Sequence, residues 1–291
     1  MFKKLSYKKQ EKVIIFLFLV IPLLLLGIFT FLPALNMIHY SFMDWNGYSS
    51  VKKWVGFANY EQIFKNPMYF QPLENSLYYF FGGLLQLVVA FYLAVVINIK
   101  IMGKSLFKAL YFFPFLINGV AISLIFVFFF RPDGTLDSIL KMLGMGSFIQ
   151  QWLGNAKIVN FSLAGVSIWR YVGFNFIIFL GAIQAISPEI IEAADLDGAN
   201  EWQKIKYITL PSVKKIVQLN LILTVSGAIS VYEIPLIMTG GSNGSNTFVI
   251  QTVNTAFKFQ QVGLASAMGV IVLIIVGAAT IVQNVYFKEA E

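Results

Sequence analysis

The residue types that enzymes use for catalysis are sparse in this sequence. It has no Cys, so disulfides, thiolate metal sites and cysteine nucleophiles are excluded, and its one histidine, His39, has no neighbouring cluster of ligands. Gly103-Lys104-Ser105 ends like a phosphate-binding loop, but Asn98 stands where that motif needs its first Gly, and an apolar helix precedes it. No catalytic residue, metal site or ATPase site is therefore predicted, and Lys104 is interpreted as a topology residue.

Two ionisable residues stand inside otherwise apolar segments. Arg170 lies in the first half of the run 161–183, and Glu233 lies near the end of the run 216–238. An ionisable group at membrane depth is costly and usually faces a water-filled cavity or a partner. Their similar depth is compatible with a structural ion pair, and also with a pore-lining role for at least one of them.

These two residues belong to long apolar runs that dominate the chain. Hydrophobic residues make up 58% of it and charged residues 12%, against a usual charged share of about 25% in soluble domains. Six runs approach the roughly 20 residues that a helix needs to cross a bilayer. They are Val13–Leu35, Leu77–Ile97, Ala109–Phe130, Phe161–Ile183, Ile216–Met238 and Val262–Tyr286. The runs do not alternate as β-barrel strands do, so they predict an all-α integral membrane protein with six transmembrane helices.

The distribution of basic residues predicts the orientation. The segments 1–12, 98–108, 184–215 and 287–291 hold 13 Lys in 60 residues, whereas 36–76, 131–160 and 239–261 hold 7 Lys or Arg in 94. By the positive-inside rule both termini are cytoplasmic. The net charge of +7 is explained by this sorting, and no nucleic-acid partner is predicted. The predicted organisation is a cytoplasmic segment 1–12, an uncleaved first helix 13–35, an outer loop 36–76, a core 77–286 with a cytoplasmic loop 184–215, and a cytoplasmic tail 287–291.

The inner loop 184–215 is too well punctuated for a disordered link. Ser187 can cap a short helix, Pro188 suits its first turn, and Gly198 provides a left-handed stop. A second short helix over 200–210 leads to Pro211 at the entry to the next span. Two short cytoplasmic helices are therefore predicted between the fourth and fifth spans.

This loop carries a family resemblance. Glu192-Ala193-Ala194, Gly198 and Ile208-x-Leu210-Pro211 resemble, position for position, the "EAA" loop of binding-protein-dependent ABC importer permeases. Further motifs are similar to those of the carbohydrate branch, the maltose-permease-F-like subunits. These are Val55-Gly56-Phe57-x-Asn59-Tyr60, Glu74-Asn75-Ser76, Tyr111-Phe112-Phe113-Pro114, Arg131-Pro132-Asp133-Gly134-Thr135-Leu136, and Thr239-Gly240-Gly241, after which Ser242 and Asn243 replace the usual Gly and Pro.

The resemblance implies a multi-pass subunit of a bacterial plasma membrane, working by alternating access. It implies two nucleotide-binding ATPase partners that carry ATP and Mg, a second and different permease subunit, and an extracytoplasmic solute-binding protein that docks on the outer loops. Membrane lipid surrounds the chain, which carries no cofactor of its own. The residues implied to couple it to the ATPase are Glu192, Ala193, Ala194, Asp197 and Gly198.

The resemblance also implies a sugar or oligosaccharide as cargo. Sugars present C–H faces to aromatic rings and hydroxyls to neutral hydrogen-bonding groups. In the run 216–238, Ser226, Ser230 and Glu233 follow i, i+4, i+7 spacing and are predicted to share one helix face. The candidate substrate-path residues are Arg170, Tyr171, Phe174, Asn175, Ser226, Ser230, Tyr232 and Glu233. Each aromatic residue among them also fits lipid-facing packing.

Three alternatives stay open at this point. Arg170 in the path would favour an anionic cargo, such as glycerol phosphate or an acidic oligosaccharide, unless Glu233 cancels its charge. An ion-coupled secondary transporter would need an inverted repeat and buried carboxylates, and the sequence shows no convincing repeat. In the third alternative, the first short helix of the inner loop binds no partner and merely lies on the bilayer surface as an amphipathic connector. Its acidic residues disfavour this alternative, because helices on the bilayer surface favour Lys and Arg.

Overall fold

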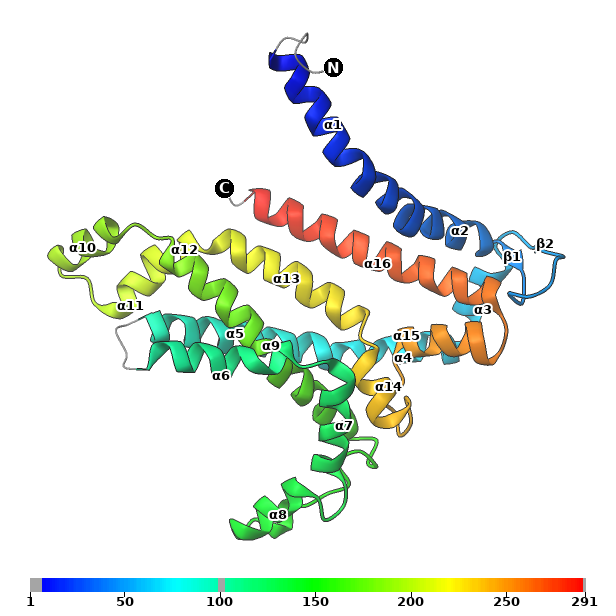
Figure 1. Ribbon diagram of the computed structural model, residues 1–291. Coiled ribbons are helices and arrows are strands. Elements are labelled where there is room, and N and C mark those ends of the chain that lie inside the picture. The colour runs from blue at the N-terminus through cyan, green and yellow to red at the C-terminus, as the bar shows by residue number, and fades with distance from the viewer. Residues whose placement is uncertain (1–6, 99–102, 290–291) are drawn as a thin grey trace. The chain divides into compact units, whose positions relative to one another are not determined.

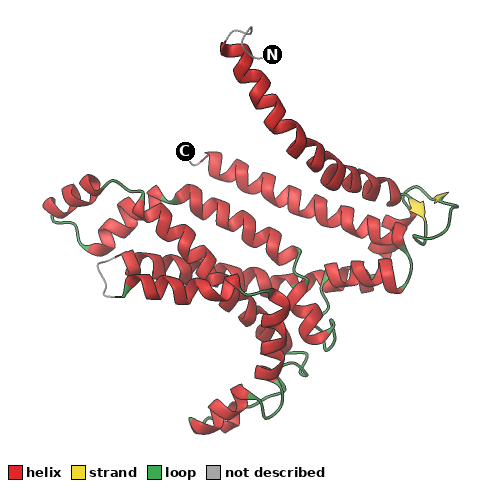
Figure 2. Cartoon of the chain, viewed as in Figure 1, coloured by secondary structure: helices red, strands yellow, loops and turns green. Residues whose placement is uncertain are grey.

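The computed structural model describes residues 7–98 and 103–289. Residues 1–6 and 99–102 of the predicted inner segments, and the last two residues of the predicted tail, lie outside this range. Figure 2 shows helices along nearly all of the described chain and one pair of short strands. The chain forms two compact units, Met1–Lys65 with Thr252–Ile271, and Asn66–Gln251 with Val272–Glu291.

The first unit begins with a long apolar helix. It contains α1 (Tyr7–Leu26), a π-helical turn η2 (Gly27–Phe31), α2 (Leu32–Tyr40), β1 (Met43–Asp44), β2 (Lys53–Trp54), α3 (Ala58–Lys65), η5 (Asn254–Lys258) and the first turns of α16 (Val262–Glu289). The strands pair antiparallel, with Met43 opposite Trp54. Over Ile14–Tyr40 the helix is apolar, and none of its residues is buried. Such a surface requires lipid or another subunit around it.

The loop after α2 is held by polar side chains from α3. The Asn59 amide donates to the carbonyl oxygens of Ser41 and Met43 at 2.8 and 2.9 Å, and the Tyr60 hydroxyl donates to Ser41 Oγ at 2.7 Å. Asn59 and Ser41 are buried, so these bonds satisfy backbone groups that water does not reach. The Asn59-Tyr60 part of the sequence motif therefore stabilises this loop.

The second unit holds the remaining helices (Figure 1). They are α4 (Pro67–Glu74), α5 (Ser76–Asn98), α6 (Lys104–Leu116), α7 (Gly119–Phe130), α8 (Thr135–Met142), η3 (Gly146–Phe148), α9 (Val159–Gln184), α10 (Pro188–Leu196), α11 (Glu201–Lys204), η4 (Ile205–Thr209), α12 (Leu210–Ser212), α13 (Lys214–Ile229), α14 (Glu233–Thr239) and α15 (Phe248–Val253). At its centre α9 packs against α5, α6, α13 and α14.

Close backbone approach brings α6 and α9 together. A Cβ atom on Gly173 would overlap the carbonyl oxygen of Tyr111, so only glycine fits there. Membrane helices commonly approach one another through small residues in this way. Beside this contact, Phe176 and Phe179 of α9 are almost fully buried with Leu87 of α5.

The described chain has five helical segments long and apolar enough to cross a membrane, which together match five of the predicted runs. They are Ile14–Tyr40, Pro67–Asn98, Val159–Gln184, Lys214–Thr239 and Val262–Val285. A sixth span is present only if α6 and α7 are counted together, and these two helices meet at an angle of 95°. The predicted run 109–130 is therefore divided between two helices.

The bend in this run has a local cause. Pro114 cannot donate a backbone hydrogen bond, and Ile117 and Asn118 adopt ψ values of 139° and 134°, outside the helical region. The Asn118 side chain accepts from the Val120 amide at 2.8 Å and so caps a new helix that begins at Gly119. Hydropathy does not register this capping, because the run 109–130 contains no charged residue on either side of it.

Candidate functional site

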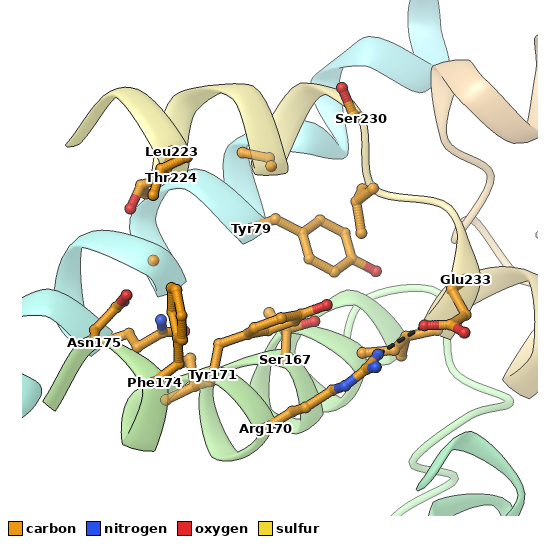
Figure 3. A pocket seen from close by; sticks show the side chains of 18 of the residues that line it. Tyr79, Ser167, Arg170, Tyr171, Phe174, Asn175, Leu223, Thr224, Ser230 and Glu233 are labelled. Carbon is orange, nitrogen blue, oxygen red and sulfur yellow. Dashed lines mark hydrogen bonds and ion pairs between the residues drawn. The ribbon is translucent and has the colours of Figure 1, made fainter. Parts of the chain in front are cut away.

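A cavity of about 540 Å³ lies inside the second unit. Its walls come from α5, α9, α13, α14 and the link before α14, with Phe115 from α6 (Figure 3). The structure brings seven of the eight candidate path residues to this cavity and leaves out Ser226. The seven are Arg170, Tyr171, Phe174, Asn175, Ser230, Tyr232 and Glu233.

Ser226 does not line the cavity, although Thr224 and Gly227 of the same helix do. The fifth span is also not one continuous helix. Helix α13 ends at Ile229, Tyr232 adopts φ −146°, and α14 starts again at Glu233. Pro235 has no amide to donate to the carbonyl of Val231, which instead accepts from the Thr247 hydroxyl at 2.9 Å. The prediction that Ser226, Ser230 and Glu233 share one helix face is therefore wrong.

The two charged residues of the cavity form an ion pair. Arg170 Nη1 on α9 donates to Glu233 Oε2 on α14 at 2.7 Å, and Figure 3 shows this bond closing one end of the row of lining residues. The Arg170 side chain is 12% exposed and that of Glu233 42%. The guanidinium also lies 5.1 Å from the centre of the Tyr171 ring. Pairing and cavity lining, which the sequence left as alternatives, occur together.

The ion pair rests on the first residue of α7. A Cβ atom on Gly119 would overlap both the Glu233 carboxylate and Arg170 Nη1. The bend between α6 and α7 thus places a glycine where the pair needs space. Three elements that are distant in sequence, α7, α9 and α14, meet at this point.

Aromatic rings form one part of the cavity wall. Phe115 stacks on Phe174 with ring centroids 4.6 Å apart, and Tyr171 lies 6.0 Å from Phe115. The Asn175 side chain is buried beside them. Flat apolar faces next to a few polar groups are the usual composition of a small-molecule site.

Several polar residues of the cavity were not anticipated from the sequence. Gln86 and Tyr79 of α5, with Asn220 and Thr224 of α13, also line it. Within the described residues, the Tyr79 hydroxyl, Asn220 Oδ1 and Arg170 Nε are buried without a hydrogen-bond partner. Gln86 is the sole amide side chain in the run 77–97, and that could have marked it.

The predicted coupling loop is a second candidate site. Glu192, Ala193, Asp197 and Gly198 are exposed, whereas Ala194 is buried. Helix α10 begins with Pro188, and the chain leaves it through Gly198 at φ +78°. This entry and exit agree with the sequence expectation.

Two details of the same loop differ from the expectation. The Ser187 hydroxyl does not cap α10 but donates to the Glu189 carboxylate. The second helix runs from Glu201 to Ser212 and includes a π-helical turn, η4, between α11 and α12, which the sequence did not indicate. A reciprocal capping box starts it, with Gln203 N donating to Asn200 Oδ1 at 2.9 Å and Asn200 N donating to Gln203 Oε1 at 2.8 Å.

Lys204 joins the two short helices. Its ammonium contacts Asp195 Oδ1 of α10 at 2.7 Å and Glu201 Oε1 of α11 at 2.5 Å. Hydrogen bonds to Asp195 and then to Glu201 raise the pKa of Lys204. The exposed Leu196, Trp202 and Tyr207 lie on the same segments, and hydropathy gave no reason to single them out.

Two other residues singled out in the sequence, Lys104 and Asn75, hold the backbone of neighbouring segments. In the part of the chain that the structure describes, no group of three or more His, Asp and Glu side chains could hold a metal ion. Lys104 opens helix α6, and its ammonium donates to the Asn98 carbonyl at 3.3 Å. Asn75 donates to the carbonyls of Gly244 and Asn246 at 2.9 and 2.7 Å, so this motif residue holds the loop after α14.

Comparisons with known proteins identify the family. The model of the family "Binding-protein-dependent transport system inner membrane component" matches residues 86–289. The chain is 33% identical to the probable ABC transporter permease protein YurN of Bacillus subtilis, over 97% of this chain and 98% of that one. It is 32% identical to the diacetylchitobiose uptake system permease protein NgcF of Streptomyces coelicolor, over 92% and 80%.

A solved structure shares the fold. In the crystal structure of a bacterial alginate ABC transporter in complex with an alginate pentasaccharide-bound periplasmic protein, one chain matches with a TM-score of 0.82 at 19% identity, over 97% of this chain and 96% of that one. The family resemblance drawn from the EAA loop is confirmed by the family match and by the relatives. The chain belongs to the binding-protein-dependent inner-membrane components and is an ABC transporter permease, a multi-pass protein of the plasma membrane.

Proposed function

We propose that this permease imports an uncharged oligosaccharide through the cavity between α5, α9 and α13. The observation that carries the proposal is the cavity itself, which combines stacked aromatic rings with unpaired hydrogen-bonding groups. Its volume of about 540 Å³ falls inside the range of roughly 300–1,000 Å³ found for small-molecule sites. The diacetylchitobiose system of the relative NgcF supports a sugar as the cargo class.

The chemistry of the wall suits a sugar ring. Phe174 and Tyr171 present faces against which C–H groups pack. The Tyr79 hydroxyl and Asn220 Oδ1, buried and unpaired, would gain partners from sugar hydroxyls. Leaving such groups unsatisfied costs about 1–3 kcal/mol each, and a bound hydroxyl would recover that energy.

Energy for transport comes from outside this chain in the proposal. The assembly has two nucleotide-binding subunits with ATP and Mg, and one of them docks on the segment 188–212, where Glu192 supplies a charged contact and Ala193 and Gly198 permit close backbone approach. A second and different permease subunit completes the path, and a solute-binding protein delivers cargo to the loops 36–76, 131–160 and 239–261. Alternating access then moves the cavity from one side of the membrane to the other.

Purification of the tagged chain from its native host, with mass spectrometry of the co-purifying proteins, tests this assembly. We expect an ATPase, a second permease and a solute-binding protein, and the last can be screened for its sugar. Proteoliposomes that contain the complex should then transport that sugar only when ATP is supplied on the side of the membrane that carries the ATPase subunits. A lone homo-oligomer that retains no ATPase, or uptake driven by an ion gradient alone, would contradict the proposal.

The ion pair removes the support for an anionic cargo. Arg170 was its basis, and Glu233 binds that guanidinium directly. The secondary-transporter alternative is not favoured, because the family match covers most of the chain.

A further inference from the structure

We propose that Glu233 sets the charge class of the cargo, by cancelling Arg170 so that the cavity accepts neutral glycans and rejects glycans that carry carboxylates. This inference rests on the proposed function of the cavity. It assigns a specificity-determining role to Glu233 in place of a purely structural one.

The charge balance of the cavity depends on these two residues alone. All other lining residues are aromatic, aliphatic, hydroxyl or amide side chains, or glycine. With the pair formed the wall carries no net charge, and without Glu233 it would carry one unpaired guanidinium. In a partly buried site a unit charge acts strongly, because little water screens it.

Arg170 is already built to receive a carboxylate. Its side chain is 12% exposed, and its Nε is buried without a partner in the described chain. Guanidinium groups bind carboxylates through paired N–H donors and do so better than they bind neutral acceptors. Glu233 therefore occupies the guanidinium of Arg170, to which the carboxylate of an acidic sugar would otherwise bind.

The position of Glu233 is fixed by its surroundings. Thr247 binds the carbonyl of Val231 just before α14, and Gly119 leaves the space in which the carboxylate meets Arg170. The Glu233 side chain is also the more exposed of the two, at 42% against 12%. An incoming carboxylate thus meets negative charge first and finds the guanidinium already bound.

The absence of cysteine from this chain allows a direct test. In the purified transporter complex in lipid nanodiscs, a Ser230→Cys substitution places one thiol in the cavity wall, and a Ser147→Cys substitution places a control thiol on the exposed turn η3. The measured quantity is the rate at which an anionic sulfonate methanethiosulfonate modifies the thiol, divided by the rate for a cationic trimethylammonium reagent.

We expect Glu233→Gln to raise this ratio at the cavity thiol by about five- to tenfold, the size of effect expected for one unit charge within roughly 10 Å in a site of intermediate polarity. Arg170→Gln should lower the ratio, and the double variant should return it towards the wild-type value. The control thiol should not respond. If neither single substitution changes the labelling ratio at the cavity thiol, the inference is overturned.

Protection by sugars tests the charge class itself. The probes are β-1,4-mannotriose and β-1,4-trimannuronate, which differ only in carrying a hydroxymethyl group or a carboxylate at C6. Mannotriose should slow labelling of the wild-type background by the neutral methyl reagent and trimannuronate should not, whereas trimannuronate should protect in Glu233→Gln. Equal protection by both sugars in the wild-type background would overturn the inference.

Failure of the proposed function would look different. A thiol that the neutral reagent never reaches, with or without nucleotide, or that neither sugar protects in any background, would argue against the cavity as the sugar path. If Glu233→Gln is not recovered from the membrane, the exchange of Arg170→Glu with Glu233→Arg keeps the cavity neutral. That variant should show the wild-type labelling ratio, and a shifted ratio would contradict charge cancellation.

Discussion

At the scale of residues, the cavity is organised around one ion pair and the glycine beneath it. Arg170 and Glu233 meet at 2.7 Å, and removing one partner leaves the other charge without compensation in a partly buried site. Gly119 is therefore as much a part of this arrangement as the two charged residues. Its role comes from the absence of a side chain, which no sequence pattern in a single chain reveals.

We expect Gly119→Ala to destabilise the protein by about 1–3 kcal/mol, the usual cost of forcing a methyl group into a filled site. The added Cβ would overlap the ion pair, so the α7 end must shift or the pair must open. Thermal unfolding in detergent measures the loss. The matched control is Gly165→Ala on α9, where a Cβ meets nothing within 4 Å. Equal stability of the two variants would contradict the steric account.

Removal of the buried Tyr79 hydroxyl should affect stability and cargo binding differently. It lines the cavity and has no partner in the described chain. We expect Tyr79→Phe to leave stability unchanged or higher, because it removes an unsatisfied group, and to weaken cargo binding by about 2- to 10-fold, the value of one hydrogen bond. Thermal unfolding and sugar protection of a cavity thiol measure the two effects.

The control is the neighbouring Tyr78→Phe. Tyr78 does not line the cavity, and its ring packs edge-on against Phe161. A fall in stability for Tyr79→Phe with unchanged binding would identify its hydroxyl as structural.

At the scale of elements, apolar runs predicted where the helices lie, whereas the form of each interruption depends on particular hydrogen-bond partners. Five spans lie within the described chain close to the predicted positions. The run over 109–130 bends by 95° and the run over 216–238 is interrupted before Glu233, because Asn118 caps a new helix and Thr247 replaces the donor that Pro235 lacks. These partners depend on local geometry, and Thr247 lies 16 residues after Val231, so composition alone does not predict the contacts.

The same limit applies to the cavity. Seven of eight candidate residues were found from charge, aromatic character and the family resemblance. Tyr79 and Asn220 were missed, because an isolated polar residue in an apolar run has no periodic signal that says which way it points. Ser226 does not line the cavity, although it precedes Gly227, which does.

Lys204 connects the two short helices of the segment 188–212, called the coupling segment after its proposed role, and we expect Lys204→Met to loosen α10. Loss of its contact with Asp195 should increase amide hydrogen exchange across α10. The pKa of Lys204 is raised above its ordinary value of 10.5. Its contribution is therefore complete below that value and is lost only as the pH rises through the raised pKa. The difference between variant and wild type should stay constant between about pH 7 and 9, well below the ordinary pKa of a lysine.

Lys206→Met is the control, since the Lys206 ammonium lies over the Tyr207 ring, 5.0 Å from its centroid. Equal exchange in both variants would show that the bridge from Lys204 does not hold α10.

At the scale of the whole molecule, the cavity and the coupling segment share their helices. Helix α9 carries Arg170 to Asn175 and runs on to Gln184, just before α10. Helix α13 leaves the coupling segment at Lys214 and carries Asn220 and Thr224 to the other wall. We therefore expect a displacement of the segment between them to act on both walls of the cavity, as the proposed alternating access requires.

This arrangement makes a charge reversal at Glu192 the most direct test of coupling. Glu192 is exposed on α10, more than twenty residues along the chain from Arg170, so Glu192→Lys should leave folding and sugar protection of the cavity unchanged. If Glu192 meets a basic partner surface, reversal places like charges together, which costs several kcal/mol and lowers association with the ATPase by about two orders of magnitude. The measurements are co-purification of the ATPase and ATP-driven uptake.

The control is Glu189→Lys, which makes the same charge change one turn earlier on the same exposed helix. Normal ATPase recovery and normal uptake with Glu192→Lys would show that α10 does not transmit the ATPase cycle, and the docking surface would then be sought at the exposed Leu196 and Trp202.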